Sequence, residues 1–284
     1  MAPSAIAQAP VAPGVTTIPH DSPMRENAVS ADFDVAKHLN YSPPAKILTM
    51  KDLGLEPTEL SPIATTEPFP LLSHEGVLQH RRDIFNQDVL DNCVHKTRPG
   101  SVQIRGMAPR YSRFIKQFWN SPEVLKIVSD NAGVELVPAL DYETCHVNVQ
   151  GGLDEVRSTP VEPPAATEEA IQRLAAQNAP EGPDGYNEKK AIIEWHKDSH
   201  PWVCVVMLSD ARYMTGGETI LQKGDGSSLP VIAPQMVSAL ILCRLLPYLQ
   251  TFIVTNERFR ATLFYCKVAI SCILPLQSPI CPNA

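Results

Sequence analysis

The chain has 284 residues, of which 44% are apolar and 19% are charged, and its formal net charge is −7. These values are ordinary for a globular protein and exclude a collagen-like or coiled-coil chain. Nucleic-acid binding needs a concentrated positive face, and this acidic chain has no cluster of Lys and Arg. Its composition therefore argues against a nucleic-acid partner.

Cysteine usage and the absence of targeting segments favour a cytoplasmic location. Seven cysteines lie between Cys93 and Cys281 without a C-x-x-C pair, which is typical of scattered buried thiols in a reducing compartment. The N-terminus has neither the basic nor the apolar region of a signal peptide. The apolar stretch from Val231 to Thr255 is interrupted by Pro234 and Pro247, so we expect no membrane-spanning helix there.

In chain order, residues 1–30 are rich in Ala, Pro, Ser and Thr without periodicity, which predicts a disordered lead-in. Residues 31–284 are expected to form a single domain. Its first part, from Asp32 to Pro70, is punctuated by prolines and predicts semi-extended structure.

Two helical regions follow, at Gly76–Cys93 and Tyr111–Asn131. Apolar residues recur at intervals of three to four in the second region, and Ser121 before Pro122 is a typical helix start. These helices are expected to be scaffold.

The segment LVPALDYETCHVNVQ alternates between polar and apolar residues, which predicts a strand. One face of this strand would carry Tyr142, Thr144, His146 and Asn148. That face could line a cavity or could equally lie open to water.

Residues 151–190 carry many Pro, Gly and acidic residues, with one helical candidate at Thr167–Asn178. An insertion of this composition predicts a lid or a mobile surface segment. From Ile192 onward the pattern is strand-like again, and Trp202–Leu208 reads as a buried strand. Turns are expected at Gly216-Gly217 and at Lys223–Gly226, and further short apolar stretches follow at regular spacing. Many short strands with such turns indicate a sandwich or jelly roll.

His196 and Asp198 stand two apart in an extended segment, so both side chains would project to the same face. An imidazole and a carboxylate, joined by a histidine from a later strand, form the facial triad that holds Fe(II) in non-haem oxygenases. An H-x-D tripeptide also occurs as an ordinary surface pair.

The motifs around this pair occur in a characteristic order. The H-x-D strand precedes an apolar strand ending in Leu-Ser-Asp, then GGETILQKGDGS and APQM. In this order they resemble the fungal 2-oxoglutarate- and Fe(II)-dependent oxygenases, many of which serve secondary metabolism. The resemblance extends upstream through YSPPAKILTMKDLGL, SPIATTEPFPL, SPEVLKIVSDNAGVELVPALDYE and HVNV, and covers residues 33–240.

The resemblance implies an α+β fold with a double-stranded β-helix (jelly roll) core and flanking N-terminal helices. It also implies a dioxygenase that uses Fe(II), 2-oxoglutarate and O2 on a small organic molecule. From the charge and the proline positions noted above, we expect no nucleic acid and no membrane as partner. His196 and Asp198 would bind the iron, while Asn148 and Tyr142 would contact 2-oxoglutarate or the substrate.

The chain departs from the family pattern at the third iron ligand, because no histidine follows His200. The family's spacing places Tyr248 at that corner and Arg258 as the anchor for the distal carboxylate of 2-oxoglutarate. Either Tyr248 replaces the histidine, or the atypical tail, residues 237–284, is an altered reading of the gene. His200 and His146 are further candidate ligands.

Three functions remain open on these residues. The first is the oxygenase, and the second is a catalytically impaired jelly-roll relative that acts as a binding module. A zinc hydrolase is the third, although it needs a third protein ligand and a general base that the sequence does not show.

Overall fold

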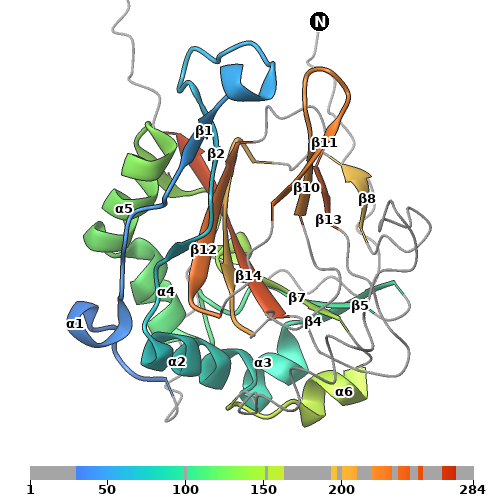
Figure 1. Cartoon of the computed structure of the whole chain (residues 1–284). Helices are drawn as coiled ribbons and strands as arrows, with labels where there is room; N and C mark the ends of the chain where they lie inside the picture. The colour runs from blue at the N-terminus through green and yellow to red at the C-terminus, as the bar shows by residue number, and fades with distance from the viewer. Residues whose placement is uncertain are drawn as a thin grey trace, which may run out of the picture.

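The computed structural model describes residues 30–98, 101–150, 153–162, 193–196, 200–209, 219–231, 236–243, 249–251 and 264–272 (Figure 1). They form two antiparallel sheets and a layer of helices, which confirms the α+β prediction. The helices are α1 (Val35–His38), α2 (His74–Ile84), α3 (Gln87–Asn92), α4 (Arg113–Asn120), α5 (Pro122–Ala132) and α6 (Leu153–Ser158), with 3-10 turns η1 (Lys51–Leu53) and η2 (Asp141–Glu143).

The strands divide between a ten-stranded and a four-stranded sheet. The larger sheet contains β1 (Ile47–Thr49), β2 (Ile63–Thr66), β3 (Phe69–Pro70), β4 (Val94–Arg98), β5 (Ser101–Ile104), β6 (Leu136–Pro138), β7 (His146–Gln150), β9 (Trp202–Met207), β12 (Ser238–Cys243) and β14 (Phe264–Cys272). The smaller sheet contains β8 (Ile193–His196), β10 (Thr219–Gln222), β11 (Ser228–Val231) and β13 (Leu249–Thr251).

From β7 onward the chain passes repeatedly between the sheets. Strands β7, β9, β12 and β14 belong to the larger sheet, whereas β8, β10, β11 and β13 form the smaller one in the order β11-β10-β13-β8. Strand β14 lies between β9 and β7 in the larger sheet, with Cα of Lys267 opposite both Val205 and His146. The last strand therefore joins the two halves of that sheet.

The helices α1, α2, α4 and α5 lie on one side of the larger sheet, and the smaller sheet lies on the other (Figure 1). Ser121 ends α4 and caps α5 through a hydrogen bond from the backbone N–H of Val124, with Pro122 at the first helical position, as predicted. Phe114 and Phe118 of α4 are fully buried and give this layer its apolar contact with the core.

Several other elements match the sequence pattern. The predicted strand at Trp202–Leu208 is β9, and the turn at Lys223–Gly226 connects β10 to β11, with Gly226 at a φ of +82°. The predicted helix at Gly76–Cys93 is divided into α2 and α3, because the side chain of Asn86 accepts from the backbone N–H of Val89 and starts a new helix. The lead-in 1–30, apart from Ser30, lies outside the described residues.

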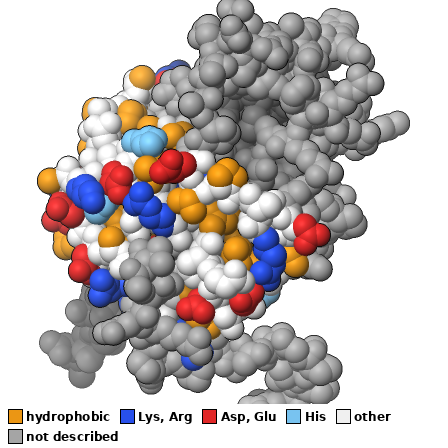
Figure 2. Space-filling view, turned by 90° about the horizontal axis from the view of Figure 1, so that it is seen from below, with side chains coloured by type: hydrophobic (Ala, Val, Ile, Leu, Met, Phe, Trp, Pro, Cys, Tyr) orange, Lys and Arg blue, Asp and Glu red, His pale blue; other side chains and the backbone are white. Residues whose placement is uncertain are grey.

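Four cysteines of the described residues are buried thiols outside any disulfide: Cys93, Cys145, Cys204 and Cys243. This agrees with the prediction of scattered thiols, and burial raises the pKa of Cys93 to about 12. None of the helices that the structure describes is long and apolar enough to cross a membrane. Over the described part of the face in Figure 2, Lys and Arg side chains lie interspersed with Asp and Glu.

The first part of the predicted insertion is packed against the helical layer. Helix α6 buries Val156 completely, and Arg157 at its end donates to the Asp91 carboxylate at 3.0 Å. The helical candidate at 167–178 and the rest of the insertion beyond residue 162 lie outside the described residues. Residues 153–162 are thus held to the domain.

Arg81 of α2 fixes this segment from within the core. Its side chain is buried and donates from Nε to the carbonyl of Val161 (2.5 Å), from Nη2 to that of Pro160 (2.7 Å) and from Nη1 to that of Leu208 (2.9 Å). Burial lowers the pKa of Arg81 to about 10, so the guanidinium stays charged at neutral pH. One side chain thereby ties residues 160–161 to the end of β9.

We expect Arg81→Met to destabilise the protein by on the order of 3 kcal/mol, because three carbonyl oxygens lose a charged donor, and that of Leu208 is buried. Urea unfolding at pH 7 measures this. Arg82→Met is the matched control, since Arg82 is partly exposed and pairs with Glu75 at the surface, where an ion pair contributes less than about 1 kcal/mol. Equal losses in the two variants would contradict the role given to Arg81.

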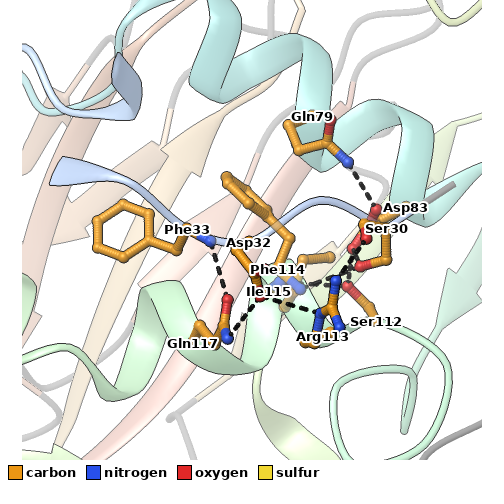
Figure 3. Close-up of polar contacts among 10 residues, drawn as sticks. All are labelled: Ser30, Asp32, Phe33, Gln79, Asp83, Ser112, Arg113, Phe114, Ile115 and Gln117. Atoms are coloured by element: carbon orange, nitrogen blue, oxygen red, sulfur yellow. Dashed lines mark hydrogen bonds and ion pairs between the residues drawn. The ribbon is translucent and has the colours of Figure 1, made fainter. Parts of the chain in front are cut away.

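A second buried charge holds the N-terminal segment (Figure 3). The carboxylate of Asp83 accepts from Ser30 Oγ (2.9 Å), from Gln79 Nε2 (3.0 Å) and from Ser112 Oγ, the cap of α4. Ser30 Oγ in turn accepts from the backbone N–H of Phe114 at 3.1 Å. The segment that starts at Ser30 is therefore bound to both α2 and α4.

Burial gives this region two groups with opposite pH dependence. Desolvation raises the pKa of Asp83 to about 6, although its three side-chain donors act in the other direction. Desolvation lowers the pKa of the fully buried His80 to about 4. Protonated Asp83 stabilises the folded protein fully below pH 3.8, and this stabilisation is lost as the pH rises through about 6. Neutral His80 stabilises the folded protein above pH 6.5, and this stabilisation is lost as the pH falls to about 4.

We expect Asp83→Asn to remove the Asp83 contribution to the pH dependence. A pKa that rises from 3.8 in the unfolded chain to about 6 in the folded protein corresponds to roughly 3 kcal/mol of stability. As the pH rises from 3.8 to about 6, the wild type should therefore lose up to that much free energy of unfolding relative to Asp83→Asn. Urea unfolding in steps from pH 4 to pH 7 follows the difference. Asp130→Asn, an exposed change on α5, serves as the control. If the difference in free energy of unfolding between wild type and Asp83→Asn stays constant with pH, the proposed link between Asp83 protonation and stability is wrong.

Candidate functional site

His196 is the last residue of β8, and its backbone position is fixed by pairing with β13. The Cα of His196 lies opposite that of Leu249, and Leu249 lies opposite Leu221, which is fully buried. Asp198, Tyr248 and Arg258 lie outside the described residues. Leu249, which directly follows Tyr248 in the sequence, is thus paired with His196, which stands two residues before Asp198.

Polar side chains gather on and beside strands β5 and β7, where Arg105 directly follows β5 and Glu143 lies in η2. We call Gln103, Arg105, Glu143, His146 and Asn148 the β5–β7 polar cluster. His146 and Asn148 alternate along β7 with Val147 and Val149, which are buried in the hydrophobic core. His146 and Asn148 therefore lie on the face of the sheet opposite to those valines, and Arg105 and Glu143 join them there through contacts with His146.

Three members of the cluster form a closed ring of contacts. Arg105 donates from Nε to His146 Nε2 (3.1 Å) and from Nη1 to Glu143 Oε1 (3.2 Å), and His146 Nδ1 lies 3.4 Å from Glu143 Oε2. A guanidinium can only donate, so His146 must accept at Nε2 and carry its proton on Nδ1. This ring occupies both imidazole nitrogens, which argues against His146 as a metal ligand.

Glu143 is ionised at neutral pH and links the cluster to the H-x-D segment. The hydrogen bond from His146 first, and the charge of Arg105 further, hold the pKa of the Glu143 carboxyl below its usual value against the effect of burial. The imidazole of His200 also contributes, so His200 lies within electrostatic reach of this carboxylate. The residue two positions after Asp198 is thus close to the cluster.

The predicted placement of Tyr142 on a strand is wrong. Residues Asp141–Glu143 form the 3-10 turn η2 and Cys145 has a φ of +58°, so the alternating pattern begins only at His146. The Tyr142 side chain is 42% exposed, and its hydroxyl lies 3.0 Å from His95 Nε2. The Tyr142 hydroxyl nevertheless stays on the face of the sheet that carries Asn148, because His95 lies opposite Gln103 and Gln103 lies opposite Asn148.

Asn148 is on the predicted face and is buried, with an exposed fraction of only 9%. Its Oδ1 accepts from Gln103 Nε2 at 3.0 Å, and the two Cα atoms lie opposite each other. Within the described ranges its Nδ2 amide makes no hydrogen bond. This amide is consequently free to bind a ligand.

Sequence reasoning missed Arg105 and Glu143. The alternation in Ser-Val-Gln-Ile-Arg, with Val102 and Ile104 buried, is the signal that could have indicated β5 and hence the side on which Arg105 lies. No comparable signal marks Glu143, whose role depends on contacts with distant residues.

No group of three or more His, Cys, Asp and Glu side chains that could hold a metal occurs among the described residues, which do not include Asp198. The cluster instead offers hydrogen-bond donors, chiefly the Arg105 guanidinium, which the Glu143 carboxylate holds in place.

Comparisons with known proteins identify distant likenesses. No protein-family model and no curated protein matches the chain. Among solved structures, a 2OG-Fe(II) oxygenase family oxidoreductase from Burkholderia pseudomallei is similar with a TM-score of 0.43 and 10% identity, over 70% of this chain and 79% of that one.

Two further similar structures come from eukaryotes. A full-length Neurospora crassa protein, solved in complex with alpha-KG, has a TM-score of 0.34 and 10% identity over 70% of this chain and 68% of its own. The dioxygenase for auxin oxidation 1 from Arabidopsis thaliana, solved with 2-oxoglutarate, has a TM-score of 0.31 and 12% identity over 81% of this chain and 77% of its own. At these TM-scores none of the three fixes the cofactor or the reaction of this chain.

Proposed function

We propose that this protein is a 2-oxoglutarate- and Fe(II)-dependent dioxygenase acting on a small organic molecule, in secondary metabolism as the motif resemblance implies. Its core is a double-stranded β-helix. The passage of β7 to β14 between two antiparallel sheets supports that architecture, because a jelly roll is built from eight strands divided between two facing sheets.

The observation that carries the proposal is the pairing of β8 with β13. A facial iron site needs an imidazole and a carboxylate from one strand and a third ligand from a strand beside it. The register of His196 with Leu249 supports a strand beside β8 at this point, and Leu249 is the residue that shares the face of His196. Tyr248 precedes the first residue of β13, and the family spacing is what proposes it as the third ligand. The buried position of Leu221, opposite Leu249, supports an interior location for this part of the sheet.

The donor set suits Fe(II) at two of its three protein positions. The imidazole of His196 and the carboxylate of Asp198 are ligands that Fe(II) accepts, whereas the Tyr248 phenol is a poorer neutral donor. Bound there, the iron would supply the activation of O2 that is coupled to decarboxylation of 2-oxoglutarate. The guanidinium of Arg258 would bind the distal carboxylate of the co-substrate through two parallel hydrogen bonds.

The β5–β7 polar cluster would form one wall of this site. Asp198 stands two residues before His200, so their Cα atoms are at most about 7 Å apart. Because His200 lies within electrostatic reach of Glu143, the proposed iron site and the cluster are neighbours. The Asn148 amide and the Tyr142 hydroxyl remain proposed contacts for 2-oxoglutarate or substrate.

The alternative is a catalytically impaired relative that serves as a binding module. The tyrosine at position 248 favours it, because loss of one imidazole weakens iron binding without disturbing the strands that enclose the site. A binding module would keep the fold and the cluster but hold no iron.

We expect Asp198→Ala to lower iron occupancy and to reduce succinate formation from 2-oxoglutarate by on the order of 100-fold or more, because one of the proposed ligands is lost. Metal analysis and a succinate assay on purified protein measure both. Asp225→Ala, in the exposed β10–β11 turn, is the control. Activity that survives in Asp198→Ala would exclude the iron site, and a folded wild type without iron or succinate would favour the binding module.

We expect Tyr248→His to raise the affinity for Fe(II) at least about tenfold, because an imidazole completes the facial triad. Anaerobic iron titration gives the dissociation constants. Tyr41→His, which changes an exposed tyrosine in the N-terminal part of the chain, should leave the affinity unchanged. Equal affinities in wild type and Tyr248→His would remove position 248 from the third corner.

A further inference from the structure

Two members of the β5–β7 polar cluster keep hydrogen-bond donors that no residue in the described part of the chain accepts. Arg105 donates from Nε to His146 and from Nη1 to Glu143, while its Nη2 has no partner among the described residues. Asn148 accepts a hydrogen bond from Gln103 at Oδ1, and its Nδ2 makes no hydrogen bond to any described residue. Asn148 as a residue is nine-tenths buried, so its side chain is held in place while this donor stays available to a ligand.

These donors lie on the same face of the sheet. Gln103 and Asn148 are opposite each other on paired strands, and His146 is two residues from Asn148 on β7. Arg105 follows Gln103 by two residues and contacts His146 directly. Side chains two apart on a strand share a face, so Arg105 and Asn148 are presented together.

The ring of contacts also fixes the direction of the guanidinium. Glu143 and His146 hold its Nε and Nη1 side, and the arginine side chain is still 31% exposed. The part that remains free is the Nη2 edge. A guanidinium that is already oriented loses little conformational freedom when it binds a ligand oxygen.

The chemistry of the free groups selects the ligand. Both oxygens of Glu143, Nε2 of His146 and Oδ1 of Asn148 are already engaged within the cluster. Apart from the Gln103 carbonyl, what the cluster offers is N–H groups. A ligand that binds here must therefore present oxygen acceptors, as a carboxylate or a carbonyl does.

We propose that Arg105 and Asn148 together bind a carboxylate or carbonyl oxygen of the primary substrate, which defines the substrate as an oxygen-acceptor-bearing small molecule. The proposal rests on the dioxygenase function for the location of the reaction, but the binding of such an oxygen does not require iron. Glu143 and His146 are positioning residues that orient Arg105.

Ligand-observed NMR with benzoate, benzamide and toluene tests this on the full chain. Benzoate carries a carboxylate, benzamide a carbonyl, and toluene neither. We expect benzoate or benzamide to bind at least tenfold more tightly than toluene, and we expect Arg105→Met to abolish that preference. Arg113→Met, an exposed change on α4 that loses the pair with Asp32 and a hydrogen bond to the carbonyl of Ser30, should keep it.

Asn148→Asp provides a second variant that preserves the shape of the side chain. It replaces the free amide by a carboxylate oxygen, so benzoate should bind at least tenfold more weakly while the protein stays folded. Unchanged benzoate binding in both Arg105→Met and Asn148→Asp, or no preference over toluene in the wild type, would overturn the proposal.

Two further measurements separate this inference from the proposed function. Asp198→Ala should keep the preference for benzoate or benzamide over toluene, even if iron binding is lost. Repeating the titration without oxygen, with Fe(II) and saturating 2-oxoglutarate, should leave benzoate binding intact. Displacement of benzoate by 2-oxoglutarate would assign these donors to the co-substrate and overturn the inference, although the dioxygenase function would stand.

Discussion

The pairing of β14 with its two neighbours is the interaction on which the rest of the structure depends. One edge of this strand pairs with β9 and the other with β7, and its last residues also pair with β6. Without it, β1, β2, β12 and β9 would form one sheet and β7, β5 and β4 another. A segment of the compositionally atypical tail thus occupies the centre of the larger sheet.

The β5–β7 polar cluster depends on the same pairing of β14 with β7 and β9. The strands β5 and β7 hold Gln103 and Asn148 opposite each other, and β14 places this pair beside the buried strands β9 and β12. The ring formed by Arg105, Glu143 and His146 then fixes one charged side chain at a partly exposed edge. Rigid strands with satisfied hydrogen bonds are the kind of support that a binding group needs in order to keep its direction.

Local patterns in the sequence predicted much of the fold. Ser121 before Pro122 marked the start of α5, and the apolar run from Trp202 marked β9, because each signal involves neighbouring residues only. Tyr142 was misplaced because the 3-10 turn and the positive φ at Cys145 interrupt an alternation that the residue types alone suggest. Contacts such as that of Arg105 with Glu143, 38 positions apart, are set by strand pairing and leave no local signal.

The central place of β14 also constrains how the protein is made. Synthesis runs from the N-terminus, so β7 and β9 leave the ribosome well before residues 264–272 do. Until then each exposes an unpaired edge, and such edges recruit other chains. Because the closing contacts join segments that are far apart in sequence, they form late and slowly. The nascent chain therefore has a period of vulnerability to aggregation that ends only when β14 is inserted.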